Sequence, residues 1–419
     1  MTVEQTSQAP IAVVGAGIIG VCLAYELRRR GKPVLLLDAE APGMGASFGN
    51  MASIAVTEFM PASRPSVWAR IPGWLLDPEG PVRVRPGYLP RLTPWFLRFL
   101  AASRPSVVRA LEEQGAALCQ RVYDDLNPLL ESAGLSHMLS REGCLSLYAD
   151  ARELAADREH LDVIARLGFE SHVLTRAEVQ DLEPAISEVI GHAVLFPHNR
   201  SISNPYLLVK SLFERFLDMG GQFLQARATG FGRTGGAITH VQTALGQNLA
   251  VSQAVLCAGA YTAQLCRMLD EPIPLETERG YHTQIMAPGI SMRHSIIWPA
   301  KAFMVTPTAG GIRVGGTVEM AGLDAPPDYR RAHVLVKRAQ TALPGLQVRG
   351  ASEWMGHRPA LPDTVPIMGP SATTRGVFVA TGHGHLGLTY GATNARLMAD
   401  LMTGQTPPID MHPYRINRF

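Results

Sequence analysis

The hydrophobic pattern predicts a strand–helix–strand unit at the start of the chain. Residues 11–14 form an uninterrupted apolar run, which is typical of a strand buried on both faces, and residues 34–37 form a second one. Between these runs, Ala24 and Leu27 fall on one face of a predicted helix, and Gly31 stands where a helix C-cap belongs. Two strands joined by a helix indicate a parallel sheet and therefore an α/β fold at this end of the chain.

Helical patterns dominate the middle of the chain. Residues 106–182 read as largely helical, interrupted by one short strand at 143–148. Asn204 and Pro205 have the residue types expected at the N-cap and the first position of a further helix. The predicted inner face and end of that helix are formed by Leu208, Leu212, Phe216, Gly220 and Gly221.

The last part of the chain combines two patterns. Residues 299–318 alternate with a period of two, which predicts a hairpin that turns near 309–311. A separate antiparallel domain is therefore expected beside the α/β one. The α/β pattern itself resumes with two strands, a glycine-rich turn, a helix and a terminating glycine, at 251–257, 377–381, 382–387, 388–403 and Gly404.

The first strand–helix turn carries the glycine fingerprint of a dinucleotide site. Gly15 permits a tight turn, Gly17 lets a pyrophosphate approach the backbone, and Gly20 lets the helix pack on the sheet. Unpaired N–H groups at the start of the helix favour phosphate. Asp38, at the end of the second strand, supplies an acceptor for ribose hydroxyls and would repel a 2′-phosphate, so NADP is disfavoured. The motif alone does not separate NAD from FAD, and a plain structural turn is its alternative interpretation.

Two later segments depart from a simple nucleotide domain. Residues 42–53 form a loop of small residues, against which a bulky ligand can lie. Residues 59–105 are rich in Pro, Trp and Arg and allow two interpretations, a helical cap packed on the main domain or a patch that contacts a membrane surface. The aromatic side chains on which both interpretations depend are Trp68, Trp74, Trp95, Phe96 and Phe99.

Composition excludes several classes of protein. With 46% hydrophobic and 18% charged residues, the chain of 419 residues is neither disordered nor collagenous. A net charge of +2 provides no strong field for nucleic acid, so we expect no such partner. The five cysteines are too scattered for a disulfide framework or a zinc quartet; they read as reduced core thiols, and no metal site is expected. No signal peptide and no run of 18 apolar residues is present, so we expect a cytoplasmic protein, with peripheral attachment to the inner face of the cell membrane left open.

Together these residues resemble the D-amino-acid oxidase and dehydrogenase superfamily of flavoproteins, and most closely its bacterial D-amino-acid dehydrogenases. The resemblance covers nearly the whole chain and rests on several motifs in order rather than on the glycine fingerprint alone. The other motifs are ASFGN at 46–50, CAGA at 257–260, IRVGGTVE at 312–319, WMGHRP at 354–359, PD at 362–363 with PIMG at 366–369, and GHGHLG at 382–387.

The resemblance implies a bound FAD without a covalent link and a fold of two domains, both discontinuous in sequence. A Rossmann-like α/β domain binds the FAD, with the turn at 382–387 beside the flavin, and an α+β domain with an antiparallel sheet binds the substrate. The FAD-binding domain is expected over 1–60, 185–265 and 352–419, and the substrate domain over 61–184 and 266–351.

The resemblance also implies the site residues. Arg358, in the Arg-Pro motif, is expected to clamp a substrate carboxylate with its planar fork, and a structural ion pair with Asp363 is the alternative. Phe303 stands where some relatives carry a substrate-binding tyrosine, and His385 where some place a second arginine. Tyr281 is either a replacement hydroxyl or a core residue. The expected FAD contacts are Gly15, Gly17, Ile18, Ile19, Gly20, Asp38, Ala39, Ser47, Asn50, Met51, Ala52, Ala258, Gly259, Gly384, His385, Leu386, Gly387, Leu388 and Thr389.

The implied reaction is oxidative deamination of a D-amino acid. Hydride passes from Cα to flavin N5, and water hydrolyses the imino acid to a 2-oxo acid; no dedicated base is needed if the substrate enters as the free amine. Oxygen-using relatives often place a lysine beside the flavin, and among Lys32, Lys210, Lys301 and Lys337 only Lys301 is expected to reach it. A quinone or another respiratory carrier is therefore the expected electron acceptor.

Three alternatives remain at this point. The substrate could be a cyclic imino acid such as D-proline or cis-4-hydroxy-D-proline, because Phe303 and a scarcity of acceptors favour an apolar or cyclic side chain. The enzyme could be an amino-acid or amine oxidase that uses O2. The chain could also be a non-catalytic FAD subunit of a larger complex, against which the intact Arg358 and the complete second glycine loop speak.

Overall fold

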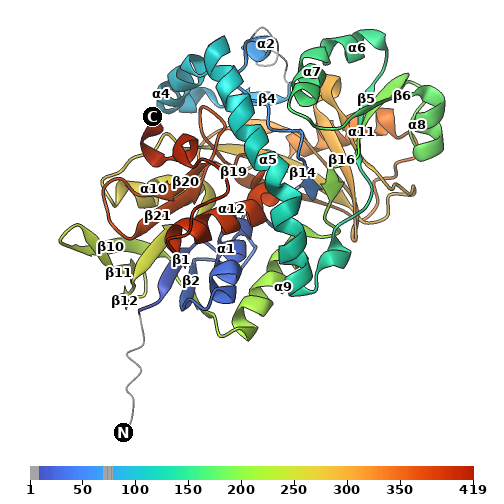
Figure 1. Cartoon of the computed structure of the whole chain (residues 1–419). Helices are drawn as coiled ribbons and strands as arrows, with labels where there is room; N and C mark the ends of the chain where they lie inside the picture. Colours follow the sequence, from blue (N-terminus) through green and yellow to red (C-terminus); the bar gives the residue numbers. More distant parts are fainter. Residues whose placement is uncertain (1–8, 69–72, 74–76, 78) are drawn as a thin grey trace.

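Two sheets of different construction organise the chain (Figure 1). The structure is a computed structural model and describes residues 9–68, 73, 77 and 79–419. One sheet has six strands that are parallel except at one edge, and the other has ten strands that are mostly antiparallel. This combination confirms the predicted fold class, a Rossmann-like α/β part joined to an α+β part with an antiparallel sheet.

The six-stranded sheet contains the predicted strand–helix–strand unit. Parallel pairs join β1 to β2 and to β13, and the last strand, β20, is antiparallel to β21. All four residues of β1 are buried, as expected for a central strand covered on both faces. In spatial order the strands are β20 (Ile367–Pro370), β21 (Val377–Thr381), β13 (Gln253–Leu256), β1 (Ile11–Val14), β2 (Val34–Asp38) and β9 (Gln222–Gln225).

Helices cover one face of this sheet, and a small antiparallel sheet covers the other. α1 (Ile18–Arg29) packs against both α9 (Pro205–Asp218) and α12 (Gly387–Met402). The N-cap predicted for α9 is confirmed, because the Asn204 side chain accepts a hydrogen bond from the Leu207 amide. Leu208, Leu212 and Phe216 are buried on its inner face, as predicted. The opposite layer consists of β10 (Ala228–Thr234), β11 (Ala237–Thr243), β12 (Asn248–Ala250) and α10 (Thr262–Arg267).

The ten-stranded sheet contains the predicted hairpin. β16 and β17 pair antiparallel around a turn at 309–310, so that prediction is confirmed. α11 (Arg330–Ala342) packs on this sheet through Leu335 and Ala339. The strands in spatial order are β4 (Val82–Val84), β18 (Val318–Met320), β14 (Glu276–Ile285), β17 (Gly311–Gly315), β16 (Phe303–Thr308), β15 (Ser295–Trp298), β5 (Cys144–Tyr148), β7 (His192–Phe196) and β6 (His172–Thr175), with β19 (Ala351–Ala360) paired to β14.

Two strands of the predicted FAD-binding segments pair in the ten-stranded sheet instead of the six-stranded one. β7 falls in segment 185–265 and β19 falls largely in segment 352–419, yet both pair within the ten-stranded sheet. These pairings join residues far apart in sequence, so local patterns could not reveal them. The division of the chain into two domains, with the segment boundaries given above, stays a prediction.

The predicted helical region is confirmed over most of its length. The long α5 (Pro105–Ala133) crosses the molecule and packs on α12 (Figure 1). The prediction missed β6, which adds a second strand to this region. Further helices in this region are α6 (Ala151–Ala156), α7 (Arg158–Arg166) and α8 (Arg176–Leu182). Before the region come α2 (Pro65–Trp68) and α4 (Leu89–Ala101), and β3 (Ser53–Ile54) pairs with β8 (Arg200–Ser201).

The aromatic segment 59–105 packs in part as a cap. Trp95 and Phe99 of α4 are buried, and the Trp95 indole donates a hydrogen bond to the Ala360 carbonyl at 3.2 Å. On the same helix Leu97 is 59% exposed, so α4 also presents an apolar outer face. Trp74 lies outside the described residues. Within the described ranges, no helix is long and apolar enough to cross a membrane.

Candidate active site

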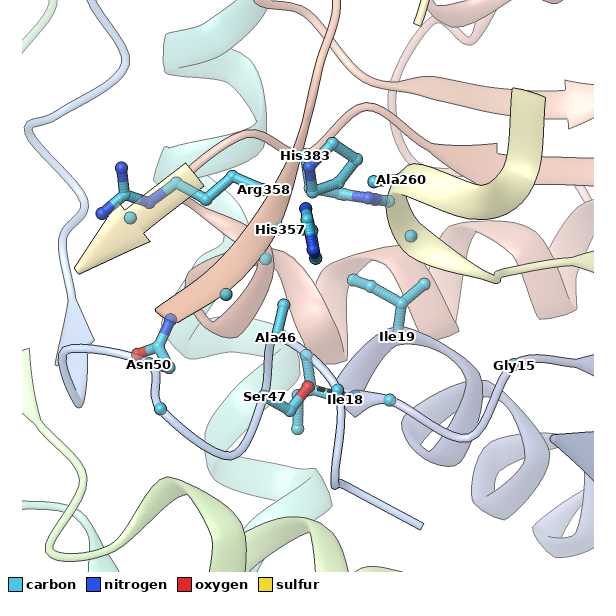
Figure 2. Close-up of a pocket in the computed structure, with 18 of the residues that line it drawn as sticks. Gly15, Ile18, Ile19, Ala46, Ser47, Asn50, Ala260, His357, Arg358 and His383 are labelled. Carbon is cyan, nitrogen blue, oxygen red and sulfur yellow. Dashed lines mark hydrogen bonds between the residues drawn. The ribbon is translucent and has the colours of Figure 1, made fainter. Parts of the chain in front are cut away.

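One cavity of about 1090 Å³ brings together residues from both sheets. It extends from the turn after β1, past the loop that carries Ser47 and Asn50, to Arg358 on β19 (Figure 2). In that view the Arg358 side chain reaches toward the side of the cavity away from Gly15 and Ile19. The volume of the cavity lies just above the usual range for small-ligand sites, as a large cofactor together with a substrate requires.

The turn between β1 and α1 has the geometry of a phosphate-binding loop. Gly15 has φ +117°, and a Cβ there would lie 2.4 Å from the Cys257 carbonyl oxygen. A Cβ on Gly20 would lie 1.8 Å from the Gly15 carbonyl oxygen, which is the close packing that the sequence predicted. The Ile18 amide donates to Ser47 Oγ at 2.9 Å, which ties the helix start to the small-residue loop (Figure 2).

Asp38 lies at the carboxyl end of β2, beside this turn. Its Oδ2 accepts from the Ala16 amide at 2.6 Å and its Oδ1 accepts from the Glu40 amide at 2.9 Å. A carboxylate has about four lone-pair sites, so capacity remains for ligand hydroxyls. The carboxylate therefore orders two backbone segments and still faces the cavity, as the predicted ribose contact requires.

The second glycine turn leads directly into α12. Gly382 and Gly384 have φ values of +81° and +53°, which favour glycine. His383 is buried and its Nε2 lies 3.2 Å from Asn394 Oδ1, so its ring is fixed within the turn. Neither α12 nor α1 has a side-chain cap or an acidic residue in its first turn. Two uncapped helix N-termini on one long cavity fit the diphosphate and the flavin of FAD.

The small-residue loop is clamped against the ten-stranded sheet by side chains to which the sequence analysis assigned no role. The ring of Trp354 packs so closely that a Cβ on Gly49 would lie 2.1 Å from it. His282 stacks on Trp354 with ring centroids 5.2 Å apart and its Nδ1 lies 3.0 Å from the Gly49 carbonyl. Arg313 donates a hydrogen bond to the Asn50 carbonyl. The loop backbone is therefore held by the same sheet that carries Arg358.

Arg358 occupies the other end of the cavity and forms no ion pair with an acidic side chain in the described part of the chain. Its Nη1 donates to the Thr317 carbonyl at 3.0 Å, and the guanidinium lies over Gly280, where a Cβ would be 2.4 Å from Cζ. Asp363 instead forms an ion pair with Arg418 at 2.8 Å. The alternative interpretation of Arg358 as the ion-pair partner of Asp363 is thus wrong.

The other predicted substrate residues are placed in different ways. Phe303 is buried and lines the cavity. His385 also lines the cavity. Tyr281 also borders the cavity, but its hydroxyl donates to Glu319 Oε2 at 2.5 Å and accepts from the Asp328 amide at 3.0 Å. These two bonds favour the core interpretation of Tyr281 over a hydroxyl offered to substrate.

Most predicted FAD contacts lie on the cavity. Four do not: Gly20 packs between β1 and α1, Leu386 and Ala52 are buried, and Thr389 Oγ1 accepts from the Ala55 amide at 3.0 Å. Ala52 adopts φ +62°, in the left-handed region. The predicted contacts that line the cavity are Gly15, Gly17, Ile18, Ile19, Asp38, Ala39, Ser47, Asn50, Met51, Ala258, Gly259, Gly384, His385, Gly387 and Leu388.

Buried thiols and neutral imidazoles complete the surroundings. All five cysteines are free and buried, as predicted, and burial raises the pKa of Cys22 to about 12. Burial also lowers the pKa of His282 to about 3 and of His357 and His383 to about 4. His385 lines a cavity inside the protein, so loss of water lowers its pKa too. In the described part of the chain, no group of three or more His, Cys, Asp or Glu side chains could hold a metal ion.

Comparisons with known proteins agree with this architecture. The family model for DAO, described as FAD dependent oxidoreductase, matches residues 10–401. The chain is 33% identical to a D-amino-acid oxidase of Bradyrhizobium diazoefficiens, with 98% of each chain covered, and 29% identical to D-amino acid dehydrogenase 2 of Ralstonia nicotianae, with 97% and 100% covered. Its fold matches glycine oxidase from Geobacillus kaustophilus at 19% identity and a TM-score of 0.78, with 99% of this chain and 100% of that chain covered. The chain belongs to the DAO family of FAD-dependent oxidoreductases.

Proposed function

We propose that this enzyme oxidises D-amino acids to imino acids, which water then hydrolyses to 2-oxo acids and ammonia. The names of its relatives support an amino-acid substrate of D configuration. The single observation that carries the proposal is Arg358, a guanidinium at the substrate end of the cavity that has no acidic partner among the described residues. A planar cation without a partner is suited to a substrate carboxylate.

Bound FAD supplies the acceptor for two electrons and a hydrogen from the substrate α-carbon. The chain itself binds and orients the substrate. Arg358 fixes the carboxylate, and the buried Phe303 provides an apolar wall. The α12 N-terminus, at Gly387, favours negative charge next to it. With the carboxylate fixed, the face of Cα that meets the cofactor decides which enantiomer reacts.

The substrate is taken to react as the free amine. His385 is neutral near pH 7, because desolvation lowers its pKa, and it adds no positive charge beside the substrate amine. Burial of the amine in the cavity disfavours its charged ammonium form, because the ammonium loses its hydration there. No side chain is therefore assigned the role of a dedicated base.

The electron acceptor is proposed to be a quinone or another respiratory carrier. Lys301, which alone was expected to reach the flavin, is exposed and lies over the Trp298 ring at 5.9 Å, away from the cavity lining. The other three, Lys32, Lys210 and Lys337, are also described and do not line the cavity. This arrangement supports a dehydrogenase over an oxidase that uses O2, which remains the second candidate because one relative is named an oxidase.

The outer face of α4 supports a contact with the membrane surface that holds such a carrier. Leu89 and Leu97 are 51% and 59% exposed, and Arg91 and Arg98 on the same helix are exposed cations. Apolar and basic side chains on one helix suit an anionic bilayer surface. Co-sedimentation with anionic vesicles checks this part of the proposal; equal sedimentation of wild type and Leu97→Glu would contradict it.

Product analysis tests the reaction itself. The purified holoenzyme is incubated with D- or L-alanine, D-proline, or cis-4-hydroxy-D-proline, either in air or with a soluble quinone, and 2-oxo acid and ammonia are measured. The proposal predicts both products from D-alanine, only with the quinone. Ammonia-free oxidation of D-proline alone would favour the cyclic substrate, and peroxide formation in air would favour an oxidase. Pyruvate from L-alanine would overturn the assigned stereochemistry.

A further inference from the structure

Two carboxylates lie at the substrate end of the cavity, where the sequence indicated a scarcity of acceptors. Glu278 is on β14 and stands directly opposite Arg358 in the register with β19. Glu58 lies in the segment that follows β3. Both are half-buried and both line the cavity.

Neither carboxylate is satisfied by the protein. Among the described residues, no side chain or amide donates a hydrogen bond to the carboxylate of Glu58 or Glu278, and neither forms an ion pair. Glu278 influences Arg358 only through space: it raises the pKa of that guanidinium, against the larger lowering by burial. A partly desolvated carboxylate without a donor is costly, so a ligand that supplies donors gains affinity there.

The charges at this end of the cavity do not balance. The other two carboxylates on the cavity, Asp38 and Glu40, follow β2 at the dinucleotide end. Arg358 is the cation that lines the substrate end. Both glutamates raise the pKa of His385, but the larger effect of desolvation lowers it and keeps the ring neutral. Among the described residues that line this end of the cavity, one cation therefore faces two carboxylates, which leaves an excess of one negative charge. His160, whose pKa Glu58 also raises, lies outside the lining and pairs with Asp157.

A simple amino acid does not complement this arrangement. The carboxylate of such a substrate binds Arg358, and its amine must lose its proton before oxidation. Both glutamates would therefore face a neutral group. A second, basic group on the side chain removes this imbalance. Resting on the proposed function, we infer that Glu58 and Glu278 select D-amino acids whose side chain ends in a cation, such as an ammonium or guanidinium group.

A matched pair of substrates tests the inference. D-Lysine and D-norleucine have the same carbon chain, and only D-lysine carries a terminal ammonium. With the purified holoenzyme and an artificial electron acceptor, kcat/KM for D-lysine is expected to exceed that for D-norleucine about tenfold or more, the usual worth of one charged contact. The preference is expected to shrink as salt is added, since added ions screen charges.

Matched variants identify the residues. Glu58→Gln and Glu278→Gln keep the side-chain shape, and each is expected to reduce the ratio of D-lysine to D-norleucine activity about tenfold. Glu131→Gln, which removes an exposed carboxylate of α5 that does not line the cavity, is expected to leave the ratio unchanged. If Glu278→Gln lowers both substrates equally, Glu278 positions Arg358 instead, and its assignment to the side chain is overturned.

The outcomes separate this inference from the proposed function. Oxidation of D-norleucine as efficiently as D-lysine would overturn the cationic subsite while leaving D-amino-acid oxidation intact. Failure of every D-amino acid, in an enzyme that holds its FAD, would overturn the proposed function and the subsite together.

Discussion

Replacing Gly280 by alanine tests the substrate clamp without touching the arginine. The Gly280→Ala methyl group would lie 2.3 Å from Arg358 Nη2 and 2.4 Å from Cζ. Ordinary contacts between such atoms are about 3.5 Å, so the guanidinium must move by about 1 Å. The obstacle is the mobile end of a side chain, and alanine is well tolerated in an extended strand such as β14, so folding should be unaffected.

A displaced clamp should affect catalysis strongly. Misplacing a positioning group by about 1 Å costs on the order of 10²-fold in rate, which is about 2.7 kcal/mol of transition-state stabilisation. We therefore expect kcat/KM for D-amino acids to fall about 100-fold in Gly280→Ala. The assay is steady-state oxidation with an artificial acceptor, together with FAD content and the melting temperature of each variant.

A matched variant separates the clamp from a general effect of the added methyl group. Gly87→Ala introduces the same methyl at a glycine with no atom within 4 Å, and it is expected to keep wild-type activity. The reasoning would be refuted if Gly280→Ala bound FAD normally and retained wild-type kcat/KM, because Arg358 would then not be the group that fixes the substrate.

Three further predictions concern the cofactor and stability. Gly15→Ala should destabilise the fold by about 2–4 kcal/mol and lower FAD content, because residue 15 has φ +117° and a Cβ there would lie 2.4 Å from the Cys257 carbonyl oxygen. Thermal unfolding and flavin absorbance measure the two effects, and full FAD occupancy would contradict the prediction. His357 and His383 have pKa values lowered to about 4 by burial, so below about pH 6.5 the unfolded chain binds protons that the folded protein does not. In urea unfolding, the free energy of unfolding should fall between pH 6.5 and pH 4 by on the order of 3 kcal/mol per imidazole. The fall should be smaller in His383→Gln. A free energy that does not change over this pH range would be inconsistent with buried neutral rings. Acid precipitation should release all flavin into the supernatant, whereas flavin retained on the protein would indicate a covalent link.

The nucleotide-binding half could be predicted because its signals are local. Gly15, Gly20 and Asp38 lie within one strand–helix–strand unit, and the Asn204 cap and inner face of α9 depend only on neighbouring residues. Periodicity and capping act over a few residues, so a single sequence carries them. The hairpin of β16 and β17 was predictable for the same reason.

The substrate half depended on contacts that sequence patterns do not encode. Glu278 stands opposite Arg358 only because of the register of β14 with β19, which joins residues 80 positions apart in the chain. Trp354 covers Gly49 through the same non-local packing. A shift of one residue in that pairing would turn these side chains to the opposite face, so no local signal could have placed them. The position of Glu58, close to the small-residue loop, was the one available hint.

Anaerobic reduction of the bound FAD tests the central claim most directly. The holoenzyme, without oxygen or any other acceptor, is mixed with single D- and L-amino acids while flavin absorbance is followed. The account predicts rapid bleaching with D-isomers, fastest with a cationic side chain, and none with L-isomers. Bleaching by L-isomers, or no bleaching by any amino acid despite bound FAD, would contradict it.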